Sequence, residues 1–427
     1  MYKCYRISEL GEVVGGGTPS TKNENFWGGS IPWITPKDLA GYTSVYISKG
    51  ENNITEAGLR SGSKLLPKDT VLITSRAPIG YIALANNPIS TNQGFKSIIC
   101  NQGICKPLYL YYYLKCNTPY LRLFGSGATF PEISGTVMKK IKLNIIEDVR
   151  VQDKLAHILK VYDDLIEKNN RKIEILQEMA EELYKEWFIR FRFPGYKDIK
   201  KKDSTLGMIP ECFKITKMSE IFENYIGGGW GNDDESNQYS VPAYVIRGTD
   251  FPSITKGKIS TCPYRWHKES NYKSRQLKVN DIIIEISGGT AEQPVGRAIL
   301  IDDNLIKRFD NKVICASFCK QVSLKQDKVS PIYFYYWMKF LYDTRMIDRF
   351  QLQSTGIINF KFEYFVRKGD VLLPPKPLMD KFDNIVATIR KDISLLAEQN
   401  ENLIQQRDLL LPRLMSGKLE VKGDAHA

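Results

Sequence analysis

Two long stretches of this chain, 149–191 and 379–414, carry apolar side chains at steps of three and four. These steps place the apolar positions on one stripe of an α-helix, which is typical of a coiled-coil seam rather than of a helix buried in a core. Each pattern persists over roughly 35 to 40 residues, far longer than an ordinary globular helix. The stripe positions are Leu155, Ile158, Tyr162, Ile166, Leu183 and Trp187, and then Phe382, Ile385, Ile389, Leu410 and Leu414. The pattern predicts the order globule, helix, globule, helix, with two helices of matched length that can pair.

The segments before the two helices share a β-rich pattern. In segment 1–147, short apolar runs bounded by glycine and proline predict strands at 31–34, 70–73, 80–84 and 97–100, and a proline-led helix from Pro107. Segment 211–376 repeats this plan, with 281–286 in the place of 69–73 and a second proline-led helix after Ser330. Both globules therefore belong to one mixed α/β type.

The two helical stretches superimpose at one constant offset, which matches Lys154 with Lys381, Leu155 with Phe382 and Trp187 with Leu414. The globules resemble each other less than the helices do, and a polar, basic linker lies between the halves. We therefore predict an internal repeat of two related halves. Its segments are 1–147 and 211–376 for the globules, 148–192 and 377–427 for the helices with the tail, and 193–210 for the linker.

The chain has 427 residues, enough for two or three domains, and a net charge of +12. The basic surplus lies on the two globules, and the helices are nearly neutral, which favours a polyanion such as nucleic acid as partner. No run of 18 apolar residues occurs, so we expect no membrane span. The polar N-terminal sequence from Met1 to Arg6 lacks a signal peptide, and we expect a cytoplasmic protein.

The usual signatures of catalysis and of metal binding are missing from the sequence. There is no phosphate-binding GxxxxGK[ST] loop, and Leu373-Pro-Pro-Lys-Pro lacks the flanks of an amino-methyltransferase motif. The three histidines do not cluster with a serine and an acid. No CxxC occurs among the eight cysteines, and Cys315 and Cys319 are better explained as buried thiols than as ligands. We therefore expect no catalysis, no metal and no cofactor in this chain.

A set of motifs along the chain resembles one family, the specificity (S) subunits of type I restriction-modification enzymes. The motifs are Leu10-Gly-Glu-Val-Val-Gly-Gly-Gly-Thr-Pro-Ser, Trp27-Gly-Gly-Ser-Ile-Pro-Trp-Ile-Thr-Pro-Lys-Asp-Leu, Thr74-Ser-Arg-Ala-Pro-Ile-Gly, Asn92-Gln-Gly-Phe, Gln152, Glu186-Trp-Phe, Gly228-Gly-Trp-Gly, Ser287-Gly-Gly-Thr and Leu411-Pro-Arg-Leu-Met-Ser-Gly-Lys-Leu. Any one motif is weak, but their order and repetition over the whole length are specific.

The resemblance implies an α+β fold with two target-recognition domains separated by two long antiparallel coiled-coil helices in a pseudo-twofold repeat. Each recognition domain would read one half of a bipartite, asymmetric sequence in double-stranded DNA. The helices, through the stripe residues, would dock two methyltransferase (M) subunits, with or without restriction (R) subunits. S-adenosylmethionine, ATP and Mg would be bound by those partners and not by this chain.

Helix geometry gives a compatible picture of the target. A helix of about 40 residues is about 60 Å long. Two heads related by a pseudo-twofold axis on one face of a duplex are expected about 10 bp apart. Because the heads differ in sequence, the two half-sites should differ as well.

Candidate DNA-contacting residues are polar or aromatic side chains in loops. A glycine run lets backbone approach phosphate, arginine at a strand end can form two hydrogen bonds to guanine, and amides suit adenine. The first half offers Thr18, Ser20, Lys22, Ser75, Arg76, Asn92, Gln93, Ser126 and Thr129, and the second half offers Trp230, Ser287, Gln293 and Arg297. Each of them could instead satisfy the backbone of a turn.

The second half departs from the first at two motifs. Ser287-Gly-Gly-Thr stands in the place of Ser75-Arg-Ala-Pro, and Ala316-Ser-Phe stands in the place of Asn92-Gln-Gly-Phe. These departures fit two heads that read different bases.

Two further features allow two interpretations each. The aromatic cluster of Tyr109, Tyr111, Tyr112 and Tyr113, echoed by Tyr333, Tyr335, Tyr336 and Trp337, could stack on bases, but on a helix it more often packs against its own sheet. Asn169, Asn170 and Asn400 interrupt the apolar stripe, either to set the register of the helix pair or to meet a partner subunit.

Two other functions remain open at this point. A non-enzymatic coiled-coil adaptor could use its basic heads to bind acidic proteins. The specificity subunit of a type IIB-like restriction system would share the same repeat.

Overall fold

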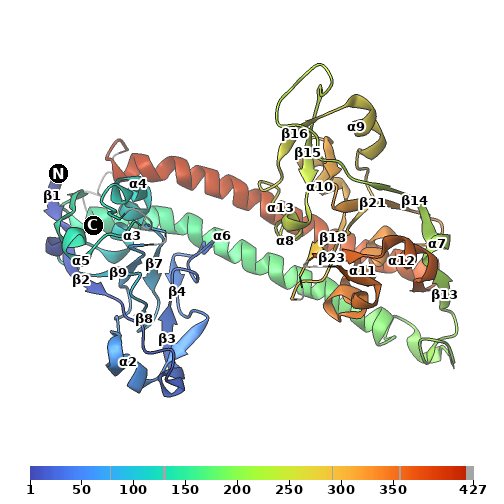
Figure 1. Cartoon of the computed structure of the whole chain (residues 1–427), viewed down its shortest axis with the longest axis horizontal. Helices are drawn as coiled ribbons and strands as arrows, with labels where there is room; N and C mark the ends of the chain where they lie inside the picture. The colour runs from blue at the N-terminus through green and yellow to red at the C-terminus, as the bar shows by residue number, and fades with distance from the viewer. Residues whose placement is uncertain (77, 128–130, 291, 355–356, 420–427) are drawn as a thin grey trace, which may run out of the picture. The chain divides into compact units, whose positions relative to one another are not determined.

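The computed structural model describes residues 1–76, 78–127, 131–290, 292–354 and 357–419 (Figure 1). Contacts divide the chain into two compact units, which we call unit 1 and unit 2. Unit 1 holds residues 1–168 and the segment from 400 onward, and unit 2 holds residues 169–399. The long helices α6 (Val149–Tyr184) and α13 (Lys376–Met415) each contribute residues to both units. The segment boundaries expected from the sequence stay a prediction.

The globule of unit 1 is rich in β-structure. Its strands are β1 (Tyr2–Arg6), β2 (Gly11–Gly15), β3 (Trp27–Ile34), β4 (Tyr46–Ile47), β5 (Asn52–Ile54), β6 (Val71–Ile73), β7 (Ile82–Ala85), β8 (Ser90–Thr91), β9 (Lys96–Cys100) and β10 (Lys142–Ile146). One sheet has the order β2-β9-β6-β7-β4, another has the order β5-β3-β8, and β1 pairs with β10. The four strands expected from the apolar runs are confirmed by β3, β6, β7 and β9.

Unit 2 repeats this topology. Its strands are β11 (Lys201–Lys202), β12 (Ile209–Pro210), β13 (Lys214–Lys217), β14 (Phe222–Gly227), β15 (Val241–Ile246), β16 (Tyr264–His267), β17 (Ile282–Glu285), β18 (Ser287–Gly289), β19 (Ala298–Leu300), β20 (Val313–Cys315), β21 (Cys319–Leu324), β22 (Gln351–Ser354), β23 (Ile357–Phe360) and β24 (Asp370–Leu373). The sheet β14-β21-β17-β19 corresponds to β2-β9-β6-β7, β16-β15-β20 corresponds to β5-β3-β8, and β13-β24 corresponds to β1-β10. In both units the second of these sheets holds a parallel pair, β3 with β8 and β15 with β20.

A proline-led helix packs inside each globule. These helices are α3 (Pro107–Cys116) and α11 (Pro331–Asp343), and each begins with proline in its first turn, where no backbone N–H is needed. Tyr109, Tyr111 and Tyr112 of α3 are fully buried, as is Tyr333 of α11. The aromatic cluster is therefore core packing, and the base-stacking interpretation does not hold.

Short helices connect the strands in both units. Unit 1 has α1 (Ile7–Leu10), η1 (Glu24–Phe26), α2 (Glu56–Gly62), α4 (Thr118–Arg122) and α5 (Gly135–Lys140). Unit 2 has η3 (Tyr196–Asp198), α7 (Met218–Ile221), η4 (Gly248–Asp250), α8 (Phe251–Thr255), α9 (Glu269–Arg275), α10 (Asp303–Arg308), η5 (Met346–Phe350) and α12 (Phe362–Lys368).

The two long helices pair antiparallel. In unit 2 the rings of Trp187 and Phe382 lie 6.1 Å apart, while Asn169 Nδ2 donates a 3.0 Å hydrogen bond to Gln399 Oε1. Residue numbers thus rise along α6 as they fall along α13. Asn169 is buried, so its polar contact is made inside this chain and supports the register interpretation.

The apolar stripe of each helix also packs on its globule. In unit 1, Leu155 and Leu159 of α6 share one core with Leu414 of α13 and with residues of α3. In unit 2, the ring of Tyr184 lies 5.7 Å from that of Tyr333 in α11. The apolar stripe of the paired helices is therefore also part of the hydrophobic core of each unit. The spacing of apolar residues in the sequence does not reveal this.

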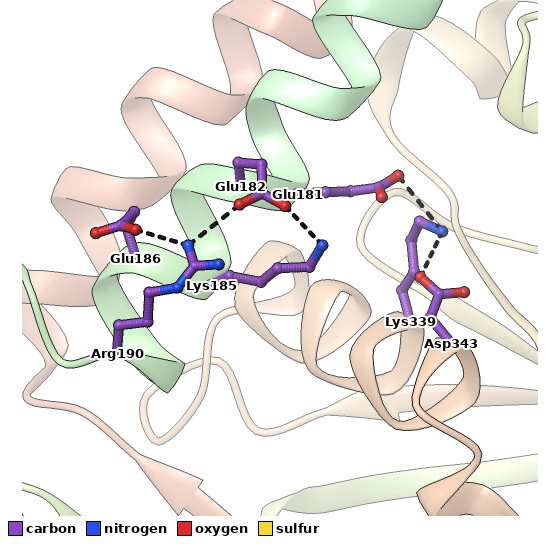
Figure 2. A network of polar contacts seen from close by, with 7 residues as sticks. All are labelled: Glu181, Glu182, Lys185, Glu186, Arg190, Lys339 and Asp343. Carbon is purple, nitrogen blue, oxygen red and sulfur yellow. Dashed lines mark hydrogen bonds and ion pairs between the residues drawn. The ribbon is translucent and has the colours of Figure 1, made fainter.

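The first long helix ends earlier than its apolar pattern. The α-helix stops at Tyr184 and continues as one π-helical turn, η2 (Lys185–Ile189), before Phe191 takes a φ of 57°. Figure 2 shows the charged residues around this end. Arg190 Nη1 lies 2.6 Å from Glu186 and 3.2 Å from Glu182, and on α11 Lys339 bridges Glu181 (3.4 Å) and Asp343 (2.9 Å). The Glu181–Lys339 pair thus links the end of α6 to α11, and the Arg190 pairs span the π-helical turn.

Candidate nucleic-acid interface

A tight turn in unit 1 joins β8 to β9 and carries the predicted amides. The N–H of Phe95 donates to the backbone oxygen of Asn92 (3.2 Å) and closes the turn. The amide oxygen of the Asn92 side chain accepts the N–H of Gly94 at 2.9 Å. Asn92 therefore supports the turn, whereas Gln93 beside it is exposed.

The predicted glycine run packs on this turn. The N–H groups of Gly16 and Gly17 donate to backbone oxygens of the turn at 3.3 and 2.9 Å. A Cβ on Gly16 would lie 2.0 Å from the backbone oxygen of Asn92, so only glycine allows this approach. Thr18 follows the run, and its hydroxyl donates to Oε1 of Gln93. Two exposed polar side chains from distant segments thus meet.

The end of β6 completes the surface. Ser75 is fully buried, and both its N–H (2.7 Å) and its hydroxyl (3.1 Å) donate to the backbone oxygen of Gly94. The guanidinium of Arg76 lies 3.7 Å from the carboxylate of Glu132, whose other oxygen lies 3.5 Å from Lys96 Nζ. One carboxylate thus holds two cations at the edge of the turn.

The structure brings most predicted residues of the first half together. Ser126 joins the group because its backbone exchanges hydrogen bonds of 3.1 and 2.9 Å with Glu132. The assembled residues are Thr18, Ser75, Arg76, Asn92, Gln93 and Ser126. The backbone oxygen of Ser20 accepts the indole N–H of Trp27 at 3.2 Å, Lys22 is exposed, and Thr129 lies outside the described residues. We call the surface of these assembled residues, with Glu132 and Lys96, the unit 1 turn surface.

Unit 2 builds the same framework from different residues. The turn between β20 and β21 is closed by the N–H of Cys319, which donates to Ala316 O at 2.9 Å. The second glycine run packs on it, with the N–H of Gly228 donating to Cys319 O (3.0 Å) and that of Gly229 donating to Cys315 O (2.9 Å). These bonds match those of Phe95, Gly16 and Gly17.

The hydrogen bonds also fix which residues correspond at the strand end. The N–H of Ile286 donates to Phe318 O at 2.9 Å, as that of Ser75 donates to Gly94 O at 2.7 Å. Ile286 therefore occupies the place of Ser75, and Ser287 that of Arg76. This corrects by one residue the correspondence expected from Ser287-Gly-Gly-Thr and Ser75-Arg-Ala-Pro, because a serine begins both motifs and conceals the shift.

Two predicted residues lie at this second surface. Trp230 is exposed; the guanidinium of Arg265 stacks 4.5 Å from its ring and also donates to its backbone oxygen at 2.8 Å. The hydroxyl of Ser287 donates to Oδ1 of Asn359 at 2.6 Å. We call this surface, with the Ala316–Cys319 turn, the unit 2 turn surface.

The other two predicted residues of unit 2 have different surroundings. Arg297 donates two hydrogen bonds to buried Glu285 (2.8 and 2.6 Å) and one to Gly248 O (3.0 Å). Burial works to lower the pKa of Arg297, but Glu285 outweighs it and the pKa is raised. Gln293 is exposed in a turn closed by its carbonyl and the N–H of Thr290 (2.8 Å). The guanidinium of Arg297 is thus engaged inside the protein.

Sequence reasoning missed Glu132, Lys96, Arg265 and Asn359. None of them lies in a motif, and each reaches the surface through a partner far away in the sequence. The Glu132 bridge to Arg76 and the 32-residue separation of Arg265 from Asp233 are examples. Only the basic surplus of the globules hinted at Lys96 and Arg265.

The described residues contain no group of three or more His, Cys, Asp or Glu that could hold a metal ion. Cys315 and Cys319 are both buried, and burial raises the pKa of Cys315 to about 12. A thiol that stays protonated is a poor metal ligand. Among the helices of the described part of the chain, none is long and apolar enough to cross a membrane.

A cavity of about 260 Å³ lies in unit 2 among α8, β19, α11 and α13. Of the cations that line it, Arg390 pairs with Asp302 at 2.7 Å, Lys339 with Glu181 and Asp343, and Arg297 with Glu285, while Arg308 donates to the backbone oxygen of Gly257. The charged groups that line the cavity are therefore bonded within the protein. The cavity is better explained as a polar contact between elements of unit 2 than as a binding site.

The predicted stripe residues differ in exposure. Leu155, Ile166, Trp187, Phe382, Ile389 and Leu414 are buried, Ile158, Tyr162, Leu183 and Leu410 are half-buried, and Ile385 is exposed. Apolar side chains outside the predicted set also face solvent on these helices, namely Val161, Leu165, Ile175, Met179, Leu395 and Leu409. In both units, the long helices therefore carry exposed apolar side chains in addition to the buried stripe.

Comparisons with known proteins point to one group. A family model described as the type I restriction modification DNA specificity domain matches residues 1–177. The chain is 32% identical over 430 residues to the type I restriction enzyme MjaIX specificity subunit of Methanocaldococcus jannaschii, covering 98% of this chain and 93% of that protein. It is 31% identical over 200 residues to the EcoR124I/EcoR124II specificity subunit of Escherichia coli, covering 44% of this chain and 48% of that one.

A solved structure agrees on the fold. The crystal structure of the S subunit of a type I restriction-modification system from M. genitalium matches with a TM-score of 0.59 at 14% identity, over 99% of this chain and 97% of that one. At this identity the match concerns the fold alone, and it confirms the predicted α+β architecture of two domains and paired long helices.

Proposed function

Because this chain belongs to the specificity subunits of type I restriction-modification enzymes, we propose that its two turn surfaces read the two halves of a bipartite, asymmetric DNA sequence. The family supplies a non-catalytic, DNA-recognising role. The recurrence of one hydrogen-bond framework in both units, with different exposed side chains on it, supports two readers of different half-sites. The positive net charge supports contact with the DNA backbone.

The unit 1 turn surface has the chemistry of direct base readout. Gln93 and Arg76 are the side chain types that form paired hydrogen bonds to adenine and guanine. Thr18 orients the Gln93 amide, and Glu132 orients the Arg76 guanidinium. Buried Ser75 and half-buried Asn92 hold the turn in shape and act as positioning residues.

The exposed apolar side chains of the long helices would dock methyltransferase subunits, with or without restriction subunits. S-adenosylmethionine, ATP and Mg would then be bound by those subunits. Burial within this chain makes Leu155, Phe382 and Leu414 part of its own fold. Docking would therefore use exposed positions such as Ile385 and Met179.

A footprint of the chain in complex with its methyltransferase subunits tests the reading of DNA. The target is first found by genome-wide mapping of the methylated motif. We expect two protected tracts separated by several unread base pairs. Protection of one continuous tract would contradict the bipartite reading.

Docking is tested by Met179→Ser and Ile385→Ser. Both variants should lose co-purification with the methyltransferase subunits while keeping the melting temperature, because both side chains face solvent. Leu65→Ser, an equally exposed apolar position away from the helices, is the control and should keep the partner. Loss of the partner in the control alone would show that the methyltransferase subunits dock away from Met179 and Ile385.

The coiled-coil adaptor is the competing function, and binding to random duplex DNA separates the two. A DNA reader loses affinity steeply as salt rises, with a slope set by the number of phosphates it neutralises. An adaptor for acidic proteins should bind random duplex weakly at every salt concentration.

A further inference from the structure

The two turn surfaces differ at the position where unit 1 has Gly94 and unit 2 has Phe318. The correspondence follows from the backbone, because Phe318 O accepts the N–H of Ile286 as Gly94 O accepts that of Ser75. A glycine and a phenylalanine thus occupy the same point of one hydrogen-bonded turn. Gly94 is buried, whereas the Phe318 side chain is 66% exposed.

Neighbouring residues have changed together with this position. A Cβ on Gly94 would lie 3.0 Å from Oδ1 of Asn92 and 3.1 Å from Cγ of Pro36, so unit 1 leaves little room for a side chain there. The N–H of Asn92 donates to Ile34 O, and that of Ala316 donates to Ile246 O. By this register Ala316 replaces Asn92.

The same register, followed two residues beyond Ile34 and Ile246, puts Gly248 in the place of Pro36. Both groups that close the space in unit 1 are therefore smaller in unit 2. Unit 2 therefore differs from unit 1 at three corresponding positions around this turn, Phe318, Ala316 and Gly248, and the space beside Gly248 holds the carboxylate of Glu285.

The backbone under Phe318 is held firmly. Ala316 and Cys319 on either side of the turn are buried, and the carbonyl of Phe318 is bonded to Ile286. Two residues beyond Ile286, Gly288 of β18 has a φ of 102° and carries no side chain. The exposed ring of Phe318 thus stands on a turn whose backbone is fixed, on the surface that also carries exposed Trp230.

We propose that Phe318 contacts the bases of the half-site read by unit 2, so that this half-site is recognised in part by an apolar contact. The proposal rests on the proposed function and specifies how unit 2 would recognise its half-site. A phenyl ring has no hydrogen bond to offer, so it can discriminate bases only through their apolar surface. That surface is either a thymine methyl group or the face of an unstacked base. Unit 1, with Gly94 at this point, reads without such a contact.

The test uses the complex with its methyltransferase subunits and duplexes that carry the mapped methylated motif. Phe318→Ala should weaken binding of the cognate duplex about tenfold or more and leave binding of a random duplex unchanged, since apolar base contacts carry specificity and not charge. Phe318→Leu should lose less. Tyr264→Ala, another half-exposed aromatic position of unit 2, is the control and should bind as the unchanged complex does.

Modified duplexes distinguish the two apolar surfaces. If the ring touches a thymine methyl group, replacing one thymine of the second half-site by uracil should weaken the unchanged complex but not Phe318→Ala. If the ring unstacks a base, 2-aminopurine in that half-site should brighten with the unchanged complex only.

If Phe318→Ala binds the cognate duplex with the same affinity as the unchanged complex, the proposal is wrong, although bipartite recognition would still stand. An unchanged complex that does not prefer the cognate duplex would instead overturn the proposed function itself.

Discussion

Asp163 of α6 pairs with Arg407 of α13 inside unit 1, although the two residues are 244 positions apart in the sequence. The other carboxylate oxygen of Asp163 accepts the hydroxyl of Tyr112 from α3 at 2.6 Å. The side chains of Asp163 and Arg407 are 5% and 13% exposed. One buried carboxylate therefore ties both long helices to the globule.

Arg407→Leu should destabilise the chain strongly, because it leaves the Asp163 carboxylate buried without its counter-charge. Breaking a buried pair in this way typically costs about 3–5 kcal/mol. The double variant Asp163→Asn with Arg407→Leu should recover much of the loss, since no charge is then stranded. The melting temperature is the measurement, and Arg171→Leu, which breaks an exposed pair with Glu174, should shift it little. Equal losses in the single and double variants would contradict this account.

Ile389→Pro should break α13 within unit 2. Ile389 is buried in the core that also contains Phe382 and Val386, and a proline inside a helix costs about 3 kcal/mol or more. We expect lower helical content by circular dichroism and loss of the methyltransferase subunits on co-purification. Ile389→Val keeps the helix and should keep the partners. Retained assembly with full methylation by the proline variant would show that α13 does not connect the complex.

Asp383 should make stability fall as the pH rises from about 4 to about 6. Burial raises the pKa of Asp383 to about 6, and its carboxylate accepts the hydroxyl of Ser330 at 2.7 Å. An unfolded aspartate has a pKa near 3.9. The folded state therefore holds a proton that the unfolded state releases in this window, and the free energy of unfolding decreases as pH increases.

Asp383→Asn removes that titration and can still accept the Ser330 hydroxyl. Its melting temperature relative to the unchanged chain should be higher at a pH of about 7.5 than at about 4.5. Asp392→Asn, an exposed position of the same helix, is the matched control. A difference that is the same at every pH would exclude Asp383 as its source.

Glu132→Gln should strengthen non-specific DNA binding and steepen its salt dependence. Glu132 lies within 4 Å of Arg76 and Lys96 and neutralises part of their charge. Its loss leaves these cations for phosphate, which should raise the slope of log K against log salt by about one. Glu51→Gln, which removes an exposed carboxylate paired with Lys37, tests whether net charge alone explains the change.

Helices and their repeat could be predicted from the sequence because their signal is local. The apolar period of α6 and α13 is set by residues three and four apart, and the constant offset agrees with the starts of the two helices at Val149 and Lys376. The proline-led helices were equally visible, since Pro107 and Pro331 mark first turns.

Side chain roles at the candidate interface could not be predicted in the same way. Ser75 and Arg76 are neighbours in sequence, yet Ser75 is buried against Gly94 and Arg76 reaches Glu132. Arg297 is a residue type that often contacts DNA, but its guanidinium donates hydrogen bonds to Glu285 on the neighbouring strand. Strand pairing depends on contacts between residues far apart in the sequence. Only the folded sheet therefore shows which side chains are exposed and available to bind a ligand.

The division of unit 1 into two sequence segments sets the order in which the chain can be completed during synthesis. Unit 2 is continuous from 169 to 399, whereas unit 1 needs the residues from 400 onward. Until these leave the ribosome, Leu155 and Leu159 lack Leu411 and Leu414 as packing partners. Unit 1, whose first segment is translated first, therefore completes its fold last. A nascent or prematurely terminated chain leaves the apolar side chains of α6 exposed to chaperones and proteases.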